Sequence, residues 1–185
     1  MYKHYSRVLG MTLVSLLFGA CAQKSSPCAA YPQVEKATTV LSPTRGNNVF
    51  GTVTFTQVDD GVLVEADIHG LEPGNHGFHV HHLGDIDSSD GTATKGHFNP
   101  HSMDHGGPFS EVRHAGDLGN ITADSSGYAR YHRIDKWLSL NGPASIVGRS
   151  VIVHAANDDL HSQPTGAAGA RVAQGVIGVS GIAND

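Results

Sequence analysis

The chain is rich in a residue that binds metals and carries protons near neutral pH. It contains 13 histidines among 185 residues, and imidazole is both the commonest metal ligand in proteins and the usual proton carrier. Nine of these histidines fall within 46 consecutive residues: His69, His76, His79, His81, His82, His97, His101, His105 and His114. The first question is how many of them share one site.

Two of the histidines alternate with an apolar residue in His79-Val80-His81. On a β-strand, residues i and i+2 point to the same side, so both imidazoles can reach one ion. Phe78 and Val80 then face the opposite, packed side. This pair alone is a weak signal of metal binding.

A second group lies in the long segment that follows, at spacings of 8, 9 and 3 residues: His97, His105, His114 and Asp117. Three imidazoles and one carboxylate make a four-ligand set that suits structural zinc. Residues 106–108, Gly-Gly-Pro, allow the segment to fold back on itself. The segment alone fits a solvated histidine-rich loop equally well.

His154 ends the apolar run Val151–His154. A single histidine in that position is more often a hydrogen-bonded core residue than a ligand. Taken with His79 and His81, however, it forms a second imidazole-rich group of the kind that binds copper.

The composition indicates which elements must position these residues. The chain is 39% hydrophobic and only 16% charged, with 23 glycines, which excludes a coiled coil and wholesale disorder. From about Val34 onward, period-two patterns predict about eight short strands and no helix of useful length, which favours an antiparallel sandwich or barrel. The clearest strands are Val49–Phe55, Val62–Ile68, Gly77–His81, Asp117–Thr122, Tyr128–Ile134, Ser150–His154 and Val172–Val179.

Two long segments, 83–113 and 155–170, lack this periodicity and are rich in Gly, Asp, Ser, Pro and His. Loops of that length inside a compact domain normally have a function. We therefore expect them to carry or cover the site.

The N-terminus predicts export. Lys3 and Arg7 precede a short apolar run that ends in Leu-Phe-Gly-Ala-Cys at residues 17–21, which resembles a bacterial lipobox with Cys21 as the lipidated residue. The alternative is an ordinary cleaved signal peptide followed by a free cysteine. We expect a signal segment at residues 1–20, a flexible tether at 21–33 and one domain at 34–185.

Removal of residues 1–20 leaves 10 Lys and Arg against 17 Asp and Glu. This acidic balance argues against nucleic acid, or an anionic membrane surface, as a partner. If Cys21 carries lipid, only Cys28 remains, so no internal disulfide can form. Cys28 lies in the tether, and we expect it to be an exposed thiol without a catalytic role.

Six motifs, in order, resemble those of the copper/zinc superoxide dismutases. The resemblance covers about Val34 to Ile182 and implies an eight-stranded Greek-key sandwich or flattened barrel, immunoglobulin-like, with two long functional loops. The motifs are Gly77-Phe78-His79-Val80-His81, Gly96-His97-Phe98-Asn99-Pro100, His105-Gly106-Gly107-Pro108, His114-Ala115-Gly116-Asp117-Leu118-Gly119-Asn120, Val153-His154 with Asp158-Asp159-Leu160, and Gly169-Ala170-Arg171 running into Gly175-Val176-Ile177-Gly178.

The resemblance implies two metals that share His97 as a deprotonated bridge. Copper oxidises one superoxide to dioxygen and then reduces a second, which takes up two protons and leaves as hydrogen peroxide. The implied copper ligands are His79, His81, His97 and His154, and the implied zinc ligands are His97, His105, His114 and Asp117.

Four further residues receive roles from the resemblance. Arg171 matches the channel arginine that attracts the anion, and Thr165 is expected on the channel rim. Asp158 matches a carboxylate that links a copper-site histidine to a zinc-site histidine, and His76 matches a structural histidine near the barrel end.

The chain departs from the family at a disulfide that most members carry. The matching positions fall near Asp90 and at Gln174, and neither is a cysteine. We hypothesise that Gln174 hydrogen-bonds the loop backbone instead. The second loop is shorter than in eukaryotic members, lacks their charged cluster, and resembles that of bacterial members.

These features predict a superoxide dismutase that protects the bacterial cell envelope, membrane-anchored through Cys21 and facing the periplasm or the exterior. A homodimer is left open. The main alternative is a non-catalytic copper- or zinc-binding storage or delivery protein on the same fold. An adhesive surface sandwich with incidental histidines does not explain the spacing of His97, His105, His114 and Asp117.

Overall fold

The computed structural model describes residue 1 and residues 32–183. The signal segment, Cys21, Cys28 and most of the tether lie outside the described residues. Within them the chain forms nine strands and one short 3₁₀ helix, η1 (Thr92–Thr94). The strands are β1 (Val34–Pro43), β2 (Phe50–Val58), β3 (Gly61–His69), β4 (Gly74–His81), β5 (Asp117–Ala123), β6 (Ala129–Asp135), β7 (Ser150–His154), β8 (Arg171–Val176) and β9 (Gly178–Ile182).

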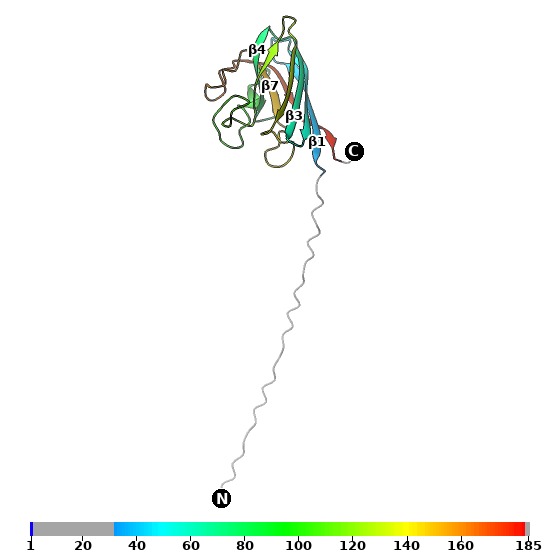
Figure 1. Cartoon of the computed structure of the whole chain (residues 1–185), viewed down its shortest axis with the longest axis vertical. Coiled ribbons are helices and arrows are strands. Elements are labelled where there is room, and N and C mark those ends of the chain that lie inside the picture. The colour runs from blue at the N-terminus through cyan, green and yellow to red at the C-terminus, as the bar shows by residue number, and fades with distance from the viewer. Residues whose placement is uncertain (2–31, 184–185) are drawn as a thin grey trace. The chain divides into compact units, whose positions relative to one another are not determined.

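The strands form one antiparallel sheet that closes on itself (Figure 1). Their order is β2-β3-β6-β5-β4-β7-β8-β1-β9, and β1 also pairs with β2. Strands β8 and β9 are separated by Ile177 alone, and both pair with β1, so together they take one place in the barrel. The prediction of an eight-stranded antiparallel fold is confirmed, in the form of a closed barrel.

The last predicted strand, Val172–Val179, is interrupted at Ile177 for a clear reason. The backbone N–H of Ile177 donates to the carbonyl of Arg149 (2.8 Å), and its carbonyl accepts from Gly148 (2.9 Å). Ile177 is therefore bonded to the segment before β7 instead of to β1, and its side chain is buried.

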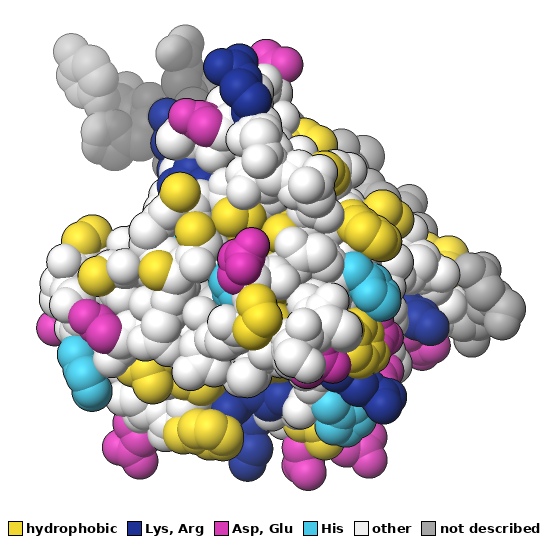
Figure 2. All heavy atoms as spheres, turned by 90° about the horizontal axis from the view of Figure 1, so that it is seen from above, with side chains coloured by type: hydrophobic (Ala, Val, Ile, Leu, Met, Phe, Trp, Pro, Cys, Tyr) yellow, Lys and Arg dark blue, Asp and Glu magenta, His cyan; other side chains and the backbone are white. Residues whose placement is uncertain are grey.

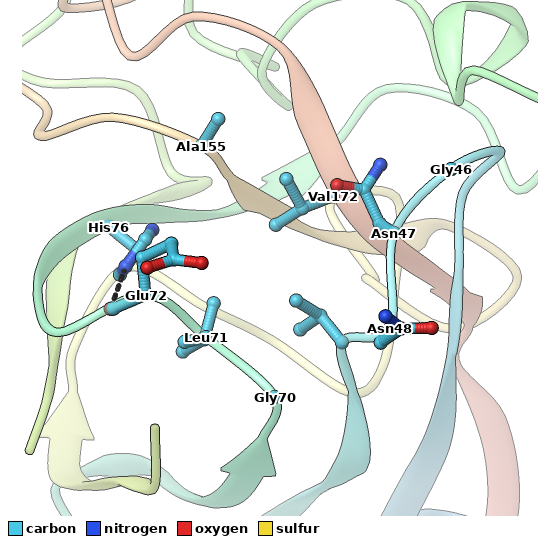
Figure 3. A pocket seen from close by; sticks show the side chains of 10 residues that line it. Gly46, Asn47, Asn48, Gly70, Leu71, Glu72, His76, Ala155 and Val172 are labelled. Carbon is cyan, nitrogen blue, oxygen red and sulfur yellow. Dashed lines mark hydrogen bonds between the residues drawn. The ribbon is translucent and has the colours of Figure 1, made fainter. Parts of the chain in front are cut away.

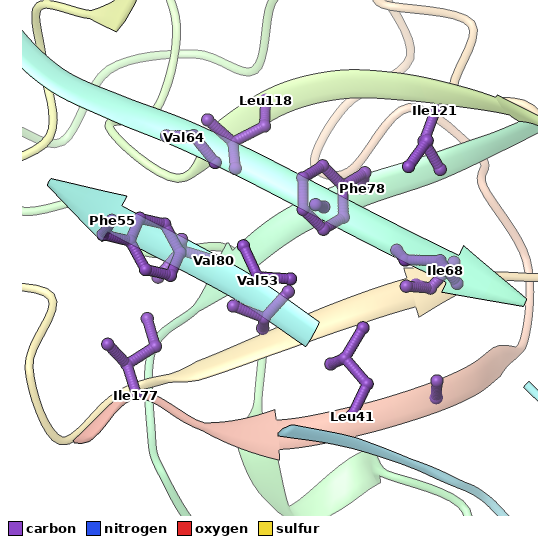
Figure 4. Close-up of a cluster of buried hydrophobic side chains, with 14 of the residues drawn as sticks. Leu41, Val53, Phe55, Val64, Ile68, Phe78, Val80, Leu118, Ile121 and Ile177 are labelled. Carbon is purple, nitrogen blue, oxygen red and sulfur yellow. The ribbon is translucent and has the colours of Figure 1, made fainter. Parts of the chain in front are cut away.

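Alternating apolar residues fill the barrel. Val62, Val64, Ala66 and Ile68 are buried on one face of β3, and their intervening neighbours are more exposed, as a half-buried strand requires. Figure 4 shows how core side chains from opposite walls meet in the interior. The side chains labelled there are Leu41, Val53, Phe55, Val64, Ile68, Phe78, Val80, Leu118, Ile121 and Ile177.

This packing determines where the histidines of β4 lie. Phe78 and Val80 belong to the barrel core, so the alternation of the strand turns His79 and His81 to the outer face of the wall. Both histidines are nevertheless buried. The long segments after β4 and after β7 cover them, so the site lies between the barrel wall and two loops.

Among the described residues, no helix is long and apolar enough to cross a membrane.

Candidate metal centre

Four imidazoles converge outside β4. His79 and His81 come from β4 and His154 from the end of β7, while His97 is held against the strand by a bridge between the backbones of His81 and His97. One ring nitrogen from each lies within 4.8 Å of the others, and all four residues are buried. We call these four residues the imidazole set.

Hydrogen bonds to backbone carbonyls show which nitrogens of two of these rings are free. Nδ1 of His81 lies 2.7 Å from the carbonyl of Lys95, and Nδ1 of His154 lies 3.1 Å from that of Gly169. Carbonyls only accept, so both Nδ1 atoms carry hydrogen. In the neutral rings neither Nε2 atom then carries hydrogen. The two Nε2 atoms lie 3.3 Å apart, but no hydrogen bond can form between them. Two lone pairs that face each other in this way suit a cation.

In the other two rings, hydrogen bonds to carboxylates likewise leave one nitrogen free. Nε2 of His79 donates to Asp158 (2.8 Å) and Nδ1 of His97 to Asp117 (2.7 Å). The opposite nitrogens, Nδ1 of His79 and Nε2 of His97, are buried with no hydrogen-bond partner among the described residues. Buried polar atoms are rarely left without a partner, because their desolvation is costly.

The imidazole set resists protonation. Burial, followed by the charge of His97, lowers the pKa values of His79 and His81 well below 6.5. Burial also lowers the pKa of His97, and it lowers that of His154 to about 4. The rings are therefore neutral at ordinary pH, which is the state that binds a metal.

A second group of nitrogen and oxygen atoms surrounds the carboxylate of Asp117. Oδ1 lies 2.7 Å from Nδ1 of His97 and 3.2 Å from Nδ1 of His114, and Oδ2 lies 3.0 Å from Nδ1 of His105. Oδ2 also accepts from the backbone N–H groups of His114 and Gly106. We call His97, His105, His114 and Asp117 the carboxylate set; one atom from each lies within 4.8 Å of the others.

The carboxylate set attracts positive charge. Burial alone raises the pKa of Asp117, but hydrogen bonds from His105, His114 and His97 outweigh it and hold the pKa far below its usual range. Burial likewise lowers the pKa of His105, but contacts with Asp117 and Asp158 outweigh it and raise the pKa to about 9. In the metal-free protein a proton on His105 therefore partly replaces the charge of a cation.

The residues present fit two metals that share His97. Four imidazoles suit copper, and three imidazoles with one carboxylate suit tetrahedral zinc. Nδ1 of His79 and Nε2 of His97 are buried without hydrogen-bond partners among the described residues, and both residues belong to the imidazole set. All seven residues of the two sets are buried. The face of the molecule in Figure 2 shows a few histidine side chains at the surface.

Asp158 connects the two sets. Its Oδ2 accepts from Nε2 of His79 (2.8 Å), and its Oδ1 accepts from Nε2 of His105 (3.0 Å). The amide of Asn120 fixes the backbone of Asp158 through two hydrogen bonds, of 2.8 and 2.9 Å. A Cβ at Gly166 would lie 1.8 Å from Oδ1 of Asp158, so only glycine fits over this contact.

Arg171 begins β8 beside the imidazole set. Its guanidinium donates to the carbonyls of Gly91 and Lys95, the latter at 2.6 Å. The carbonyl of Lys95 also accepts from Nδ1 of His81, so one oxygen connects the arginine to the imidazole set. Arg171 lines a cavity of about 370 Å³ and is a permanent cation.

Three further predicted residues are placed as follows. His76 is buried, with its ring nitrogens 2.8 Å from the carbonyls of His154 and Glu72. It lines a second cavity, of about 240 Å³, across which Asn47 lies (Figure 3). Thr165 is half-buried in the second loop, and no described hydrogen bond joins it to Arg171. Gln174 hydrogen-bonds the carbonyls of Ile86 and Ser88, as hypothesised.

Sequence reasoning missed the residues that support the carboxylate set. Arg113 is buried, pairs with both oxygens of Asp135 at 2.8 and 2.7 Å, and donates to the carbonyl of Asp117. The amide of Gln163 is bonded to the backbone N–H and carbonyl of His105. The position of Arg113 immediately before His114 is a usable signal, whereas nothing local marks Gln163.

A closed antiparallel barrel with two buried ligand sets that share one histidine fits a protein that binds two metal ions side by side. Residues 49–177 match the family model described as copper/zinc superoxide dismutase (SODC), and the chain belongs to this family. A solved structure titled "Crystal Structure Analysis of the clock protein EA4" is similar to it. That structure has 44% sequence identity and a TM-score of 0.74, and the match covers 81% of this chain and 98% of that one.

Proposed function

We propose that the protein is an active superoxide dismutase, which converts superoxide to dioxygen and hydrogen peroxide. In this proposal the imidazole set holds copper and the carboxylate set holds zinc. The observation that carries it is the placement of His97. Its Nδ1 faces Asp117 at 2.7 Å, and its buried Nε2, without a partner among the described residues, belongs to the imidazole set.

Copper supplies one-electron redox chemistry when bound, and zinc supplies fixed positive charge. The protein's own residues do the rest. Arg171 binds and orients the anion, and the carbonyls of Gly91 and Lys95 fix its guanidinium. Nε2 of His97 is the atom that can hold a proton and pass it to the reduced substrate. Asp158 keeps the ring nitrogens of His79 and His105 in their ligating tautomers.

Metal analysis and a superoxide assay on the purified protein test this proposal. We expect near-stoichiometric copper and zinc together with rapid dismutation. Substitution Arg171→Ala should lower kcat/KM by about tenfold or more at low salt, because focusing of an anion by a fixed cation raises association rates by that order. Near-stoichiometric copper without activity favours the alternative, a storage or delivery protein.

We also propose that the protein is exported and anchored in a bacterial cell envelope through lipid on Cys21, facing the periplasm or the exterior. The charged and apolar pattern of residues 1–20 and the lipobox-like residues 17–21 support this. Membrane fractionation of the native protein and the Cys21→Ser variant tests it. Release of the variant, but not the native protein, into the soluble fraction is expected.

A homodimer remains a proposal. Exposed valines on neighbouring strands support it: Val40 on β1, Val176 on β8 and Val179 on β9. Sedimentation equilibrium at micromolar concentration tests it, and a monomer at all concentrations contradicts it.

A further inference from the structure

The side chain of Gln174 occupies an unusual buried position on β8. It is 7% exposed, and its Nε2 donates to the carbonyls of Ile86 (3.2 Å) and Ser88 (3.1 Å). Its Oε1 is buried without a hydrogen-bond partner among the described residues. A buried acceptor without a partner lowers the stability of the folded protein. An apolar side chain would therefore suit this position better, unless the two hydrogen bonds that the amide donates serve a function.

The segment that Gln174 holds is the one that holds Arg171. The carbonyl of Ser88 also accepts from the N–H of Gly91 (3.1 Å), and the hydroxyl of Ser88 accepts from the N–H of Ala93 (2.7 Å). The carbonyl of Gly91 then accepts from the Arg171 guanidinium. The amide of Gln174 is therefore connected to the guanidinium of Arg171 through the backbone of Ser88 and Gly91.

The same three groups also pack together. Gly91 has φ of +78°, and a Cβ built on it would lie 3.0 Å from Cδ of Arg171 and 3.4 Å from Oε1 of Gln174. The loop backbone thus fits between the stem of the arginine and the amide. A shift of the loop at this point moves the guanidinium.

We propose that Gln174 is a positioning residue for anion capture: its amide fixes residues 86–95 so that the carbonyls of Gly91 and Lys95 hold the Arg171 guanidinium beside the imidazole set. The inference rests on the proposed function in one respect, that Arg171 receives the substrate anion.

The test substitutes Gln174→Leu, which retains the size of the side chain, removes the amide donors and also removes the unsatisfied oxygen. Gln57→Leu is the matched control, because Nε2 of Gln57 likewise donates to two carbonyls, those of Val58 and Gly61, in the β2–β3 turn. Gln174→Ala provides a second variant if leucine is not accommodated.

Two readouts are measured besides activity. The first is the affinity of the copper- and zinc-loaded protein for azide, followed by the copper absorption. We expect the azide Kd to rise about tenfold in Gln174→Leu, the effect of about two lost hydrogen bonds, with metal content and melting temperature retained. The second is amide hydrogen exchange, which should become about tenfold faster in residues 86–95. Gln57→Leu should change neither.

Unchanged azide affinity and unchanged kcat/KM in Gln174→Leu overturn the proposal, even if the loop exchanges faster, because the amide is then only structural. If the native protein binds azide in a Gln174-dependent way but does not dismutate superoxide, the positioning role stands and the proposed function fails. If the native protein is active and Gln174→Leu matches it in both assays, the positioning role alone fails.

Discussion

The imidazole set and the carboxylate set share His97, but they are built in opposite ways. Three members of the imidazole set lie on or at the end of barrel strands, and neutral carbonyls fix two of its rings. The carboxylate set comes mainly from the loop after β4, and the charge of Asp117 draws its members together. The first is therefore preformed by the sheet, and the second depends on electrostatics.

This difference shows what a metal contributes to each set. In the imidazole set a cation fills a space that the fold has already shaped and that stays unprotonated. In the carboxylate set a cation replaces a proton and adds to the contacts of Asp117, Asp158 and Gln163 that hold the loop in place. Zinc is thus expected to stabilise the loop, whereas copper is expected to change the fold little.

The largest expected effect comes from breaking the support of the carboxylate set at Arg113. Substitution Arg113→Leu removes the close ion-pair partner of the buried Asp135 carboxylate. The groups that remain are Arg133, whose Nε lies 3.5 Å away, and the backbone N–H groups of Trp137 and Leu138. Removing one partner of a buried ion pair costs about 3–5 kcal/mol. Denaturant unfolding of the metal-free protein should show that the free energy of unfolding falls by about 3 kcal/mol, the lower end of this range. Zinc binding should also weaken. The exposed Arg130→Leu is the control, and an equal small loss in both variants contradicts the prediction.

The next largest effect is expected for Asp158→Asn. This substitution replaces one of the two carboxylate oxygens, which accept from the ring N–H groups of His79 and His105, with an NH₂ group that can only donate. Loss of such an outer carboxylate typically costs 10- to 100-fold in metal affinity. We expect zinc affinity to fall by about that factor and copper affinity to fall less, because three other imidazoles remain. Metal analysis of this variant and of the exposed Asp159→Asn measures it. Full zinc occupancy in Asp158→Asn shows the prediction to be wrong.

The dependence of metal binding on pH separates the two sets without a mutation. Zinc must displace the proton of His105, whose pKa is raised to about 9, so zinc affinity should fall about tenfold per pH unit below pH 9. The pKa of His154 is lowered to about 4, so copper affinity should be nearly constant from pH 8 to 5. Competition titrations at pH 6, 7 and 8 measure both slopes, and equal slopes contradict the contrast.

The same shifts predict the stability of the metal-free protein. The raised pKa of His105 stabilises the folded state fully below its ordinary value of 6.5, and this contribution is lost as the pH rises through about 9. The lowered pKa of His154 stabilises it above pH 6.5, and that contribution is lost as the pH falls toward about 4. The melting temperature should therefore decline on both sides of neutrality.

The smallest expected effect concerns Lys95, a loop residue whose carbonyl accepts the hydrogen bond from Nδ1 of His81. Its backbone has φ of +65° and ψ of −151°, a region that is essentially restricted to glycine and costs of order 1–3 kcal/mol. Lys95→Gly should raise the unfolding free energy by about 1 kcal/mol with His81 still bonded. Lys36→Gly on β1 should instead destabilise. A lower melting temperature for Lys95→Gly contradicts this.

The strands were predictable from local periodicity, and the two complete ligand sets from the resemblance of the ordered motifs to a known family. Alternation of Phe78 and Val80 with His79 and His81 places the imidazoles on one face, and the ordered motifs carry the remaining ligands. The supports were not predictable in this way. Arg113 and Gln163 act on partners brought near by folding of the loops, and the strained backbone of Lys95 has no signature in its side chain. The interruption at Ile177 likewise depends on partners far away in the sequence.

The amide of Gln174 has a consequence for how the protein matures. The chain has only two cysteines, Cys21 and Cys28, so residues 32–183 contain none. The loop beside Arg171 is fastened by hydrogen bonds that form as the backbone folds, and no oxidant has to act first. Folding of these residues therefore needs no disulfide-forming step, and they contain no disulfide that a thiol could reduce.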